Sequence, residues 1–378
     1  MKLAYICTEK LPSPAIKGGA IQLMIDGVAP FLSNKFDLTI FSVADPALLQ
    51  NEYVDGIYYI RFPSEHYAQS VANELPAHHF DVIHVFNRPA HVPVYKEASP
   101  ETAIVLSLHN DMFSELKLSF QDGEKILNQV HTITTVSEYI KRTVIGRFPN
   151  TSEKITVVYS GVNLKQYPPS WSFEGISTRN QLRKKYQVQD KKVILFIGRL
   201  SKTKGPHVLI KAMSSILKKY QDAVLVIVGG KWFSENTINA YVQGLYDDAK
   251  QYGDSIIFTK YIPAINIPSM LLMGDVFVCS SQWHEPLARV HYEAMAAGIP
   301  VITTNRGGNA EVITHKKNGI VIDGFRAPDA FANAISTVFS DPNTAEQMAK
   351  KGREMVEESF QFKHVAAKLG KVYLQADK

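Results

Sequence analysis

The 378-residue sequence has little cysteine and no long apolar segment. It contains two cysteines, Cys7 and Cys279, each within an apolar run predicted as a core strand, so we expect buried thiols rather than a disulfide. No apolar run approaches the roughly 18 residues that a membrane span requires. The first residues, MKLAYICTEK, include a short apolar stretch that ends at Glu9 and Lys10, which favours a strand over a signal peptide. These features predict a cytoplasmic protein without a transmembrane segment.

The motifs of several enzyme classes are missing as well. The sequence has no HExxH, CxxC or GxSxG, which argues against the common zinc, thiol-redox and serine-hydrolase sites. No Asp-x-Asp occurs, so we expect no metal-bridged diphosphate and no other cofactor. No basic and aromatic cluster matches a recognised nucleic-acid module, so we expect no nucleic-acid partner.

The composition is that of a soluble globular enzyme, with 45% hydrophobic and 20% charged residues. A chain of this length predicts two domains. Residues 1–165 hold 14 Lys+Arg against 17 Asp+Glu, a net charge of −3, and the remainder holds 27 against 19, a net of +8. The basic second half therefore suits an anionic ligand.

Apolar runs alternate with helical stretches along the chain, which is the pattern of parallel α/β sheets. In the first half the predicted strands are LAYICT, DLTIFSV, DVIHVFN, AIVLSLH, TITTVS and KITVVYSG. In the second half they are KKVILFIGRL, AVLVIVGG, SIIFTKYI, DVFVCSS, PVITTN and GIVI. The segment from about Leu164 to Lys191, which includes PPSWSFEGIS, is predicted to be the interdomain region.

The segment DVFVCSSQWHEPLARVHYEAMAAGIPVITT predicts a strand, a loop, a helix from about Ala288 to Ala297, and a second strand. Glu285 lies in the loop and Glu293 in the helix. Helix amides beside the carboxyl end of a strand form a phosphate site, and carboxylates accept hydrogen bonds from sugar hydroxyls. We therefore predict a ligand in which a sugar is joined to a phosphate. The alternative is that Glu293 only pairs with Arg289 and that Glu285 is a solvated loop acid.

Two segments of the first half also suggest a binding role. Gly18 and Gly19 lie between a proline-containing loop and a helix that begins near Ala20, where paired glycines let the backbone approach a ligand. A turn that requires positive φ is the alternative. His109 ends the run AIVLSLH, at the carboxyl end of a predicted strand, where polar groups face a ligand crevice or serve as structural hydrogen-bonding groups. His84, in DVIHVFN, is interpreted as structural.

The segment FIGRLSKTKGPHVLIKAM places two cations after a predicted strand. Arg199 offers a planar fork and Lys204 a flexible point charge, an arrangement that suits a diphosphate. Surface loops also carry such cations, which is the alternative. Both residues and the pair of Glu285 and Glu293 fall at strand carboxyl ends of one predicted sheet.

Together these motifs resemble those of a known family, the retaining nucleotide-sugar glycosyltransferases of group 1 and family 4. The shared features are the EPFG-LEAMA-G-PVI signature, the GRL…KG…L…A pattern, a GG loop after the first strand, and the GG-x-x-E…G segment in RGGNAEVITHKKNGIVI. In that last segment Gly307, Gly308 and Glu311 would shape the far wall of the donor site, although a strand-to-helix turn with a capping acid is the alternative. The resemblance covers nearly the whole chain and is closest to the members called spore coat protein SA.

The resemblance implies the α/β fold called GT-B, in which two Rossmann-like domains with parallel sheets face a central cleft. Residues 1–165 would form the acceptor domain and 166–355 the nucleotide-sugar donor domain, and a helix in 356–378 would cross back to the first domain. The activity implied is retaining, metal-independent transfer of a hexose from a nucleotide diphosphate to an unidentified sugar, lipid or protein acceptor. The spore-coat subgroup implies a role in spore coat or cell-surface glycan assembly, other coat proteins as partners, and deposition in the coat.

The resemblance also implies roles for particular residues. His109 would contact the transferred sugar, and Glu285 would hold one of its hydroxyls. The implied donor-binding residues are Gly18, Gly19, Arg199, Lys204, Leu287, Ala288, Arg289 and Glu293. No metal ligand is implied.

The sequence departs from the family pattern at several positions. Ala288 and Arg289 replace the usual Gly-Leu, Ser160 and Asn163 replace a common Asn and Asp, and Lys260 stands where relatives usually have glycine. The competing hypothesis is a structural coat or scaffold protein built on a GT-B frame with little turnover. A third, a nucleotide-sugar epimerase or hydrolase, predicts product without an acceptor.

Overall fold

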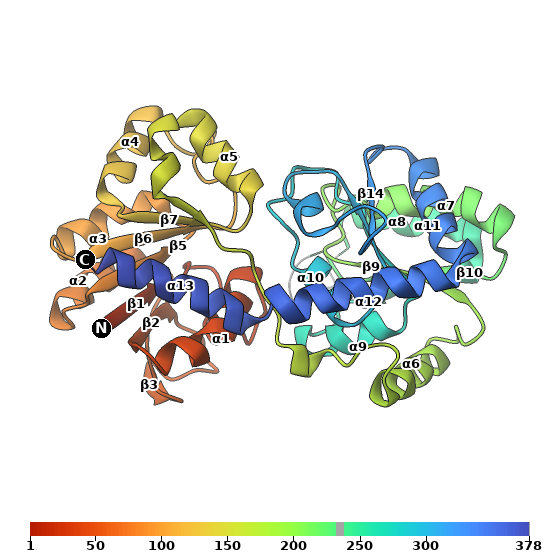
Figure 1. Cartoon of the computed structure of the whole chain (residues 1–378), viewed down its shortest axis with the longest axis horizontal. Helices are drawn as coiled ribbons and strands as arrows, with labels where there is room; N and C mark the ends of the chain where they lie inside the picture. The colour runs from red at the N-terminus through yellow and green to blue at the C-terminus, as the bar shows by residue number, and fades with distance from the viewer. Residues whose placement is uncertain (232–237, 378) are drawn as a thin grey trace. The chain divides into compact units, whose positions relative to one another are not determined.

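The computed structural model describes residues 1–231 and 238–377. These residues form two compact units (Figure 1). The first comprises Met1–Gly161 and the chain from Gln361 onward, and the second comprises Val162–Phe360. The first boundary between the units falls after Gly161, four residues before the predicted boundary at 165. The second falls after Phe360, five residues after the predicted boundary at 355.

The first unit is built on a sheet with the strand order β3-β4-β2-β1-β5-β6-β7-β8. All neighbouring strands are parallel except β3 and β4. The strands are β1 (Lys2–Ile6), β2 (Asp37–Val43), β3 (Asn51–Val54), β4 (Ile57–Phe62), β5 (Val82–Phe86), β6 (Ala103–Leu108), β7 (Thr132–Thr135) and β8 (Ile155–Val157). The α-helices are α1 (Ala20–Ser33), α2 (Tyr67–Glu74), α3 (Val92–Ala98), α4 (Phe120–Gln129), α5 (Glu138–Arg147) and α13 (Phe362–Ala376).

Helices cover both faces of this sheet because its strands bury side chains on both sides. Along β1, Leu3 and Tyr5 pack with α1 and α13, whereas Ala4 and Ile6 pack with α2 to α5. This alternation arises because successive side chains of a strand point to opposite faces of the sheet. Figure 1 shows α13 beside α1, although the two are far apart in the sequence. At their contact a Cβ on Gly27 would lie 2.3 Å from the Phe362 ring, so the close approach requires glycine.

The second unit is built on a parallel sheet with the order β11-β10-β9-β12-β13-β14. The strands are β9 (Lys192–Ile197), β10 (Ala223–Val228), β11 (Ile256–Lys260), β12 (Val276–Cys279), β13 (Val301–Thr304) and β14 (Ile320–Ile322). The α-helices are α6 (Phe173–Lys185), α7 (Pro206–Lys219), α8 (Ala240–Ala249), α9 (Ile267–Leu272), α10 (Val290–Ala296), α11 (Pro328–Ser340) and α12 (Pro342–Ser359). One core cluster joins the sheet to α7, α8, α11 and α12, while α6 packs on α9 and α10 packs on α12.

All twelve strands predicted from the sequence are present, and both cysteines are buried free thiols, as expected. The sequence interpretation missed the hairpin of β3 and β4. Its turn is Asp55-Gly56, with φ of 51° and 79°, the Asp-Gly signal of a tight hairpin. The predicted helix over 288–297 is shorter, since α10 spans Val290–Ala296.

The predicted interdomain region contains a helix that the sequence interpretation did not include. Residues 173–185 form α6, whose first turn is capped by the Ser172 hydroxyl, which accepts from the Gly175 amide at 3.0 Å. Arg179 and Arg183 on this helix both pair with Asp275. The helix belongs to the second unit, and polar contacts rather than an apolar stripe attach it.

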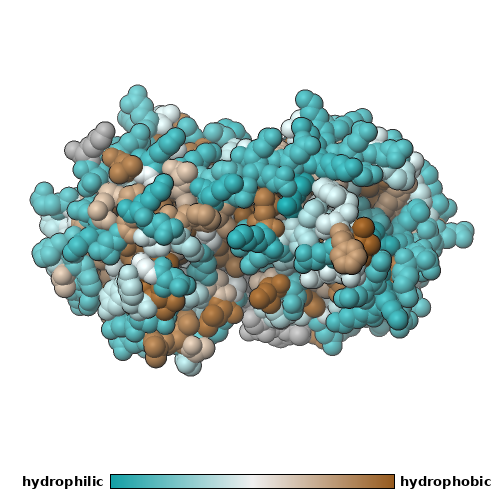
Figure 2. Space-filling model, turned by 60° about the horizontal axis from the view of Figure 1, so that its bottom comes forward, coloured by the Kyte–Doolittle hydropathy of each residue, from teal (hydrophilic) through white to brown (hydrophobic). Residues whose placement is uncertain are grey.

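In the described parts of the chain, residues 1–231 and 238–377, no helix is both long and apolar enough to cross a membrane. Figure 2 shows a face on which hydrophilic residues predominate and hydrophobic residues gather in small groups. A few large apolar side chains are strongly exposed, among them Leu116 (99%) and Phe173 (91%).

Candidate functional site

The candidate donor site lies in the second unit at the carboxyl ends of β9 and β12. These strands are neighbours in the sheet, and the chain continues from them in opposite directions, to β10 on one side and β13 on the other. Parallel α/β sheets bind ligands at such a switch point. The loop after β9 carries Arg199 and Lys204, and the loop after β12 carries Glu285, Leu287 and Ala288.

The two loops are fixed to each other by hydrogen bonds to backbone carbonyls. The Ser280 hydroxyl donates to the Lys204 carbonyl at 3.0 Å, and the Gln282 amide donates to the Thr203 carbonyl at 2.8 Å. Gly205, with φ of 74°, precedes α7, and a Cβ there would lie 2.1 Å from the Ser280 carbonyl oxygen. A side chain at position 205 would therefore force the loops apart.

Lys204 and Glu285 form the centre of the site. Lys204 Nζ lies 2.7 Å from Glu285 Oε2, which also accepts from Ser281 Oγ at 2.8 Å and Trp283 Nε1 at 2.7 Å. Glu285 is 6% exposed. Burial by itself would raise its pKa, but the Lys204 charge and the hydrogen bonds from Lys204, Trp283 and Ser281 hold the pKa of Glu285 below its ordinary value. Glu285 is therefore an ionised, well-ordered acceptor at neutral pH.

The Gly307-Gly308 pair lies directly behind Glu285. The Gly308 amide donates to the Glu285 carbonyl at 2.8 Å. Gly307 has φ of 63°, and a Cβ on it would lie 2.0 Å from the same carbonyl oxygen. These glycines line the back of the Glu285 loop and also begin the turn into the short helix η7 (Asn309–Val312), which contains Glu311. The strand-to-helix turn is therefore present, without a side-chain cap from Glu311, and the role of this segment in a donor site stays a prediction.

The residues after Glu285 depart from the expected geometry. Leu287 and Ala288 precede α10 and are not part of it, and the Ala288 amide already donates to Asn309 Oδ1 at 3.2 Å. Within the segment, Arg289 Nε and Glu293 Oε1 lie 3.6 Å apart, with both side chains 13% exposed. The pairing of these two residues, which the sequence left as an alternative, is therefore formed.

Glu293 lies in a more buried setting than a surface ion pair. Burial raises the pKa of Glu293, and the nearby charges of Arg289 and His291 only partly oppose this. His291 itself is fully buried and is bonded to the Ala288 carbonyl at 2.8 Å and Thr303 Oγ1 at 2.7 Å. Its interactions fix the segment that carries Glu293.

Arg199 follows β9 and Lys260 ends β11, two strands of the second sheet that are separated by β10. Arg199 is half-buried in the same loop as Lys204. Lys260 ends β11 with φ of 63°, a conformation that favours glycine, and its carbonyl accepts from the Gly229 amide at 3.1 Å. The lysine at the family's glycine position therefore keeps the glycine-like backbone.

The remaining predicted residues belong to the first unit. Gly18 and Gly19 have φ of 75° and 105°, and a Cβ on Gly19 would lie 2.7 Å from both Leu11 Cδ1 and Gln22 Oε1. The turn that requires positive φ is thus present, immediately before α1. His109 directly follows β6, and its backbone amide donates to Asn87 Oδ1 at 3.0 Å.

His84 lies in a buried polar network, as interpreted from the sequence. Its Nδ1 lies 2.7 Å from the Tyr373 hydroxyl and its Nε2 lies 2.6 Å from Ser107 Oγ. The Tyr373 hydroxyl also contacts that of Tyr5 at 2.6 Å. Burial lowers the pKa of His84 well below its ordinary value, so the ring is neutral. The network attaches α13 to β1, β5 and β6.

Sequence reasoning missed several polar partners. Ser281 and Trp283 donate to Glu285, and Asn309 accepts from the Ala288 amide, in the candidate donor site; the contiguous SQWHE run was the available signal for the first two. In the first unit, Arg88 and Glu9 form paired bonds of 2.7 Å after β5 and β1, the switch point of that sheet. They are 79 residues apart, and no local pattern links them. Across residues 1–231 and 238–377, no three His, Cys, Asp or Glu side chains group as a metal site would require.

Two family models match the chain, one described as Glycosyl transferases group 1 over residues 178–355 and one as Glycosyltransferase Family 4 over residues 25–166. YtcC, a candidate glycosyltransferase of Bacillus subtilis (strain 168), is 59% identical over 99% of this chain and 92% of its own length. Spore coat protein SA of the same strain is 44% identical over 99% of both chains.

The solved structures that resemble this chain have the same architecture. Anabaena Alr3699/HepE, crystallised in complex with UDP, has a TM-score of 0.81 and 22% identity over 99% of this chain and 100% of that one. Sucrose-phosphate synthase from Thermosynechococcus elongatus has a TM-score of 0.81 and 21% identity over 99% and 98%. With the family matches, this fold shows that the chain belongs to the group 1 and family 4 glycosyltransferases and has the GT-B fold.

Proposed function

We propose that this glycosyltransferase takes its sugar from a nucleoside-diphosphate donor, retains the anomeric configuration and needs no metal. The observation that carries the proposal is the 2.7 Å contact between Lys204 and Glu285 at the switch point of the second sheet. It places a cation suited to a diphosphate beside a carboxylate suited to a sugar hydroxyl. UDP and UDP-glucose in the Anabaena HepE structures support a nucleotide-sugar donor.

Charge development explains the role of the cations. When the glycosidic bond to phosphate breaks, the leaving diphosphate gains negative charge and the sugar becomes oxocarbenium-like. Arg199 and Lys204 would stabilise the diphosphate electrostatically. Ser281 and Trp283 also donate to Glu285 Oε2, so the carboxylate keeps two partners when the Lys204 ammonium turns towards a phosphate.

The segment that follows Glu285 would bind the rest of the donor. Glu293 would accept a hydrogen bond from the ribose, and its partly buried position would strengthen that bond. Arg289 would then exchange part of its contact with Glu293 for a phosphate. The Leu287 and Ala288 amides would donate to the diphosphate. The Ala288 amide can do so only if a phosphate oxygen replaces Asn309 Oδ1 as its acceptor.

The first unit would supply the remaining groups. We assign Gly18 and Gly19 to close backbone contact with the donor and His109 to contact with the transferred sugar. The acceptor would attack from the side on which the diphosphate leaves, which gives retention without an enzyme nucleophile. Exclusion of water would limit hydrolysis of the donor.

The test is a transfer assay with each nucleotide sugar that binds, a panel of simple glycosides as acceptors, and EDTA. We expect a product with the donor's anomeric configuration by NMR, at a rate unchanged by EDTA. A Lys204→Ala variant should lose at least about 100-fold in rate, the scale reported for removal of one electrostatic group. An inverted product, or activity that requires added metal, would refute the corresponding part of the proposal.

A second function is favoured by one observation, the name of the 44% identical relative, Spore coat protein SA. A coat or scaffold role would need neither donor binding nor turnover. We propose that glycan assembly at the spore coat or cell surface unites the two, with the enzyme deposited beside coat proteins. If no nucleotide sugar binds or turns over, the scaffold hypothesis replaces the enzymatic one.

A further inference from the structure

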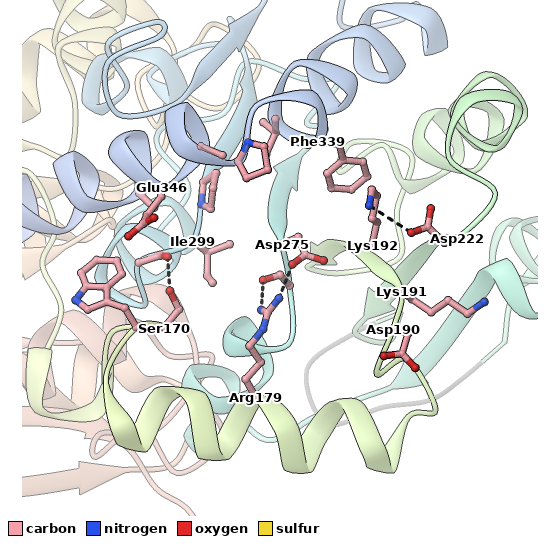
Figure 3. A pocket seen from close by; sticks show the side chains of 18 residues that line it. Ser170, Arg179, Asp190, Lys191, Lys192, Asp222, Asp275, Ile299, Phe339 and Glu346 are labelled. Atoms are coloured by element: carbon pink, nitrogen blue, oxygen red, sulfur yellow. Dashed lines mark hydrogen bonds and ion pairs between the residues drawn. The ribbon is translucent and has the colours of Figure 1, made fainter.

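The second unit contains a cavity of about 450 Å³ at the edge of its sheet opposite the candidate donor site (Figure 3). Lys192 is the first residue of β9, and Asp222, Asp275 and Pro300 directly precede β10, β12 and β13. The six residues of β9 separate the two edges by about 20 Å at 3.3 Å per residue. The cavity is therefore distinct from the donor site, and its volume is in the range of small-molecule sites, roughly 300–1,000 Å³.

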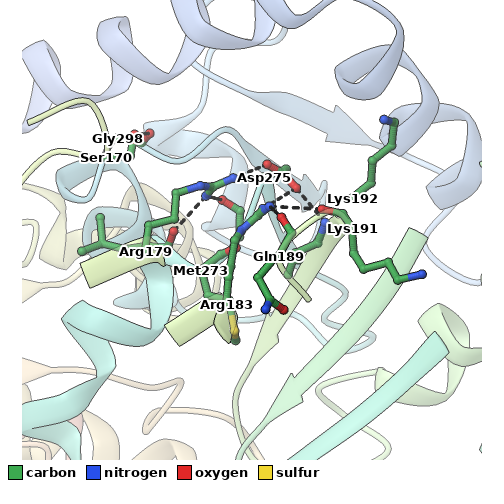
Figure 4. A network of polar contacts seen from close by, with 12 residues as sticks. Ser170, Arg179, Arg183, Gln189, Lys191, Lys192, Met273, Asp275 and Gly298 are labelled. Carbon is green, nitrogen blue, oxygen red and sulfur yellow. Dashed lines mark hydrogen bonds and ion pairs between the residues drawn. The ribbon is translucent and has the colours of Figure 1, made fainter. Parts of the chain in front are cut away.

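One wall of the cavity is a fixed polar network (Figure 4). Asp275 accepts from Arg179, from Arg183 at 2.7 Å and from the Val193 amide at 2.7 Å. Arg179 also donates to two backbone carbonyls of the turn before β12, at 2.8 and 2.7 Å. Both guanidinium groups are thus held in place by the protein. A ligand would meet a preorganised surface, which lowers the entropy cost of binding.

The charges around the cavity compensate one another. The charged residues that line it are the cations Arg179, Lys191 and Lys192 and the acids Asp190, Asp222, Asp275 and Glu346. With Arg183 behind Asp275 and Lys350 beside Glu346, five cations face four acids. Lys192 pairs with Asp222 at 3.3 Å, and Glu346 pairs with Lys350 at 2.6 Å. Because neither sign dominates, the cavity does not select for an anion such as a nucleotide, nor for a cation.

Apolar groups lie beside these polar ones. Trp171, Ile299 and Phe339 line the cavity. The Trp171 ring packs on Gly298, where a Cβ would lie 2.4 Å from the ring, and Trp171 remains 38% exposed. Figure 3 shows Glu346 at one end of the cavity and the Lys192–Asp222 pair at the other. The lining therefore offers an ordered aromatic ring together with spaced hydrogen-bonding groups.

We propose that this cavity binds a neutral saccharide. A sugar ring has C–H faces that pack on an aromatic ring, and hydroxyls that donate to carboxylates and accept from ammonium groups. Trp171 and Glu346 at one end, and Lys192 with Asp222 at the other, offer these two kinds of surface. The Lys350 ammonium lies 6.0 Å from the centre of the Trp171 ring and pairs with Glu346, so it would turn from the ring face to a sugar hydroxyl when the saccharide binds. The inference goes beyond the proposed function, because the bound saccharide need be neither donor nor acceptor of the transfer.

The test is saturation-transfer-difference NMR on the full chain with maltotetraose, cellotetraose, mannotetraose and N-acetylchitotetraose. Each oligosaccharide is used at about 5 mM, a concentration at which binding with a Kd near 1 mM, a binding free energy of about −4 kcal/mol, can be detected. A second series contains UDP, GDP and ADP to fill the donor site. We expect saturation transfer to at least one oligosaccharide, unchanged by the nucleotides. Trp171→Ala should weaken binding about 5–10-fold, the value of an aromatic contact.

Two further variants keep the result interpretable. Phe173→Ala is the matched control, because Phe173 lies two residues after Trp171 at the start of α6, is 91% exposed and does not line the cavity. Glu346→Gln, on α12, should weaken binding even if Trp171→Ala disturbs α6. No binding to any of the four oligosaccharides, displacement by nucleotides, or equal loss in the Phe173 variant would overturn the proposal. Nucleotide binding measured on the same samples separates this outcome from a failure of the proposed function.

Discussion

Replacement of Lys204 by Met removes the ammonium group that faces Glu285 while keeping a side chain of similar length. Glu285 is 6% exposed and the Lys204 side chain 20% exposed, so the pair is largely withdrawn from water. Removal of one partner of a buried ion pair costs about 3–5 kcal/mol. Because Lys204 is partly exposed, and because Ser281 and Trp283 still donate to Glu285, we expect a loss of about 2–3 kcal/mol at pH 7.

The loss should depend on pH with a defined sign. In the natural protein the Lys204 charge and three hydrogen bonds outweigh burial and hold the pKa of Glu285 below its ordinary value. Its contribution to stability is therefore present above the unfolded-state pKa and is lost as the pH falls through the folded-state pKa. In the Lys204→Met variant burial should dominate and raise the pKa of Glu285. As the pH falls, the folded variant would then take up a proton at Glu285 at a higher pH than the unfolded chain does, which stabilises the folded state. The difference between the two proteins should shrink as the pH falls from 7 to about 4.5.

Urea unfolding followed by tryptophan fluorescence measures this difference. All three tryptophans of the chain lie between residues 162 and 360, so their fluorescence reports on the second unit. Lys202→Met is the matched control, because Lys202 is exposed in the same loop, and it should change the free energy of unfolding by less than about 0.5 kcal/mol. If Lys204→Met lowers the free energy of unfolding equally at pH 7 and about pH 4.5, or does not lower it at pH 7, the ion pair does not stabilise the folded protein as we expect.

Three other substitutions test the structure. Tyr373→Phe removes a buried hydroxyl that contacts two partners at 2.6 and 2.7 Å and should cost about 1–3 kcal/mol by circular dichroism; a neutral result would contradict the network. Lys260→Gly relieves a φ of 63° and should raise the second unit's stability by about 0.5 kcal/mol, so a clear loss would show that the lysine side chain matters. Gly307→Ala would place a Cβ 2.0 Å from the Glu285 carbonyl and should cost about 2 kcal/mol or more, whereas an unchanged Tm would contradict the tight packing.

The parallel sheets were predictable because each central strand is buried on both faces and therefore reads as a continuous apolar run. The hairpin of β3 and β4 was missed because β3, with Glu52 and Tyr53, is an exposed edge strand without such a run. Helix α6 was missed for a related reason. It has no apolar stripe, and it is attached through Arg179 and Arg183 to an aspartate more than 90 residues away.

The candidate donor site was predictable in part. Strand carboxyl ends meet at one edge of a sheet, so the sequence placed Lys204 near Glu285, and the structure brings them to 2.7 Å. The Ala288 amide was expected to remain available for a phosphate, but it donates to Asn309, a partner 21 residues away. Local sequence carries no signal for such a contact. The roles of these residues in transfer stay predictions.

We propose that the second unit binds a nucleoside diphosphate through Lys204, Glu285 and Glu293. The most direct measurement is thermal unfolding of the natural protein and of Glu293→Gln, with EDTA and a panel of nucleoside diphosphates and nucleotide sugars. A ligand at 100 times its Kd adds about 2.7 kcal/mol, or roughly 5–10 °C for a unit of this size. We expect such a shift with the nucleotides of one base, and we expect Glu293→Gln to lose it and Lys202→Met to keep it. No shift with any nucleotide, or an equal shift in the Glu293 variant, would contradict the proposal.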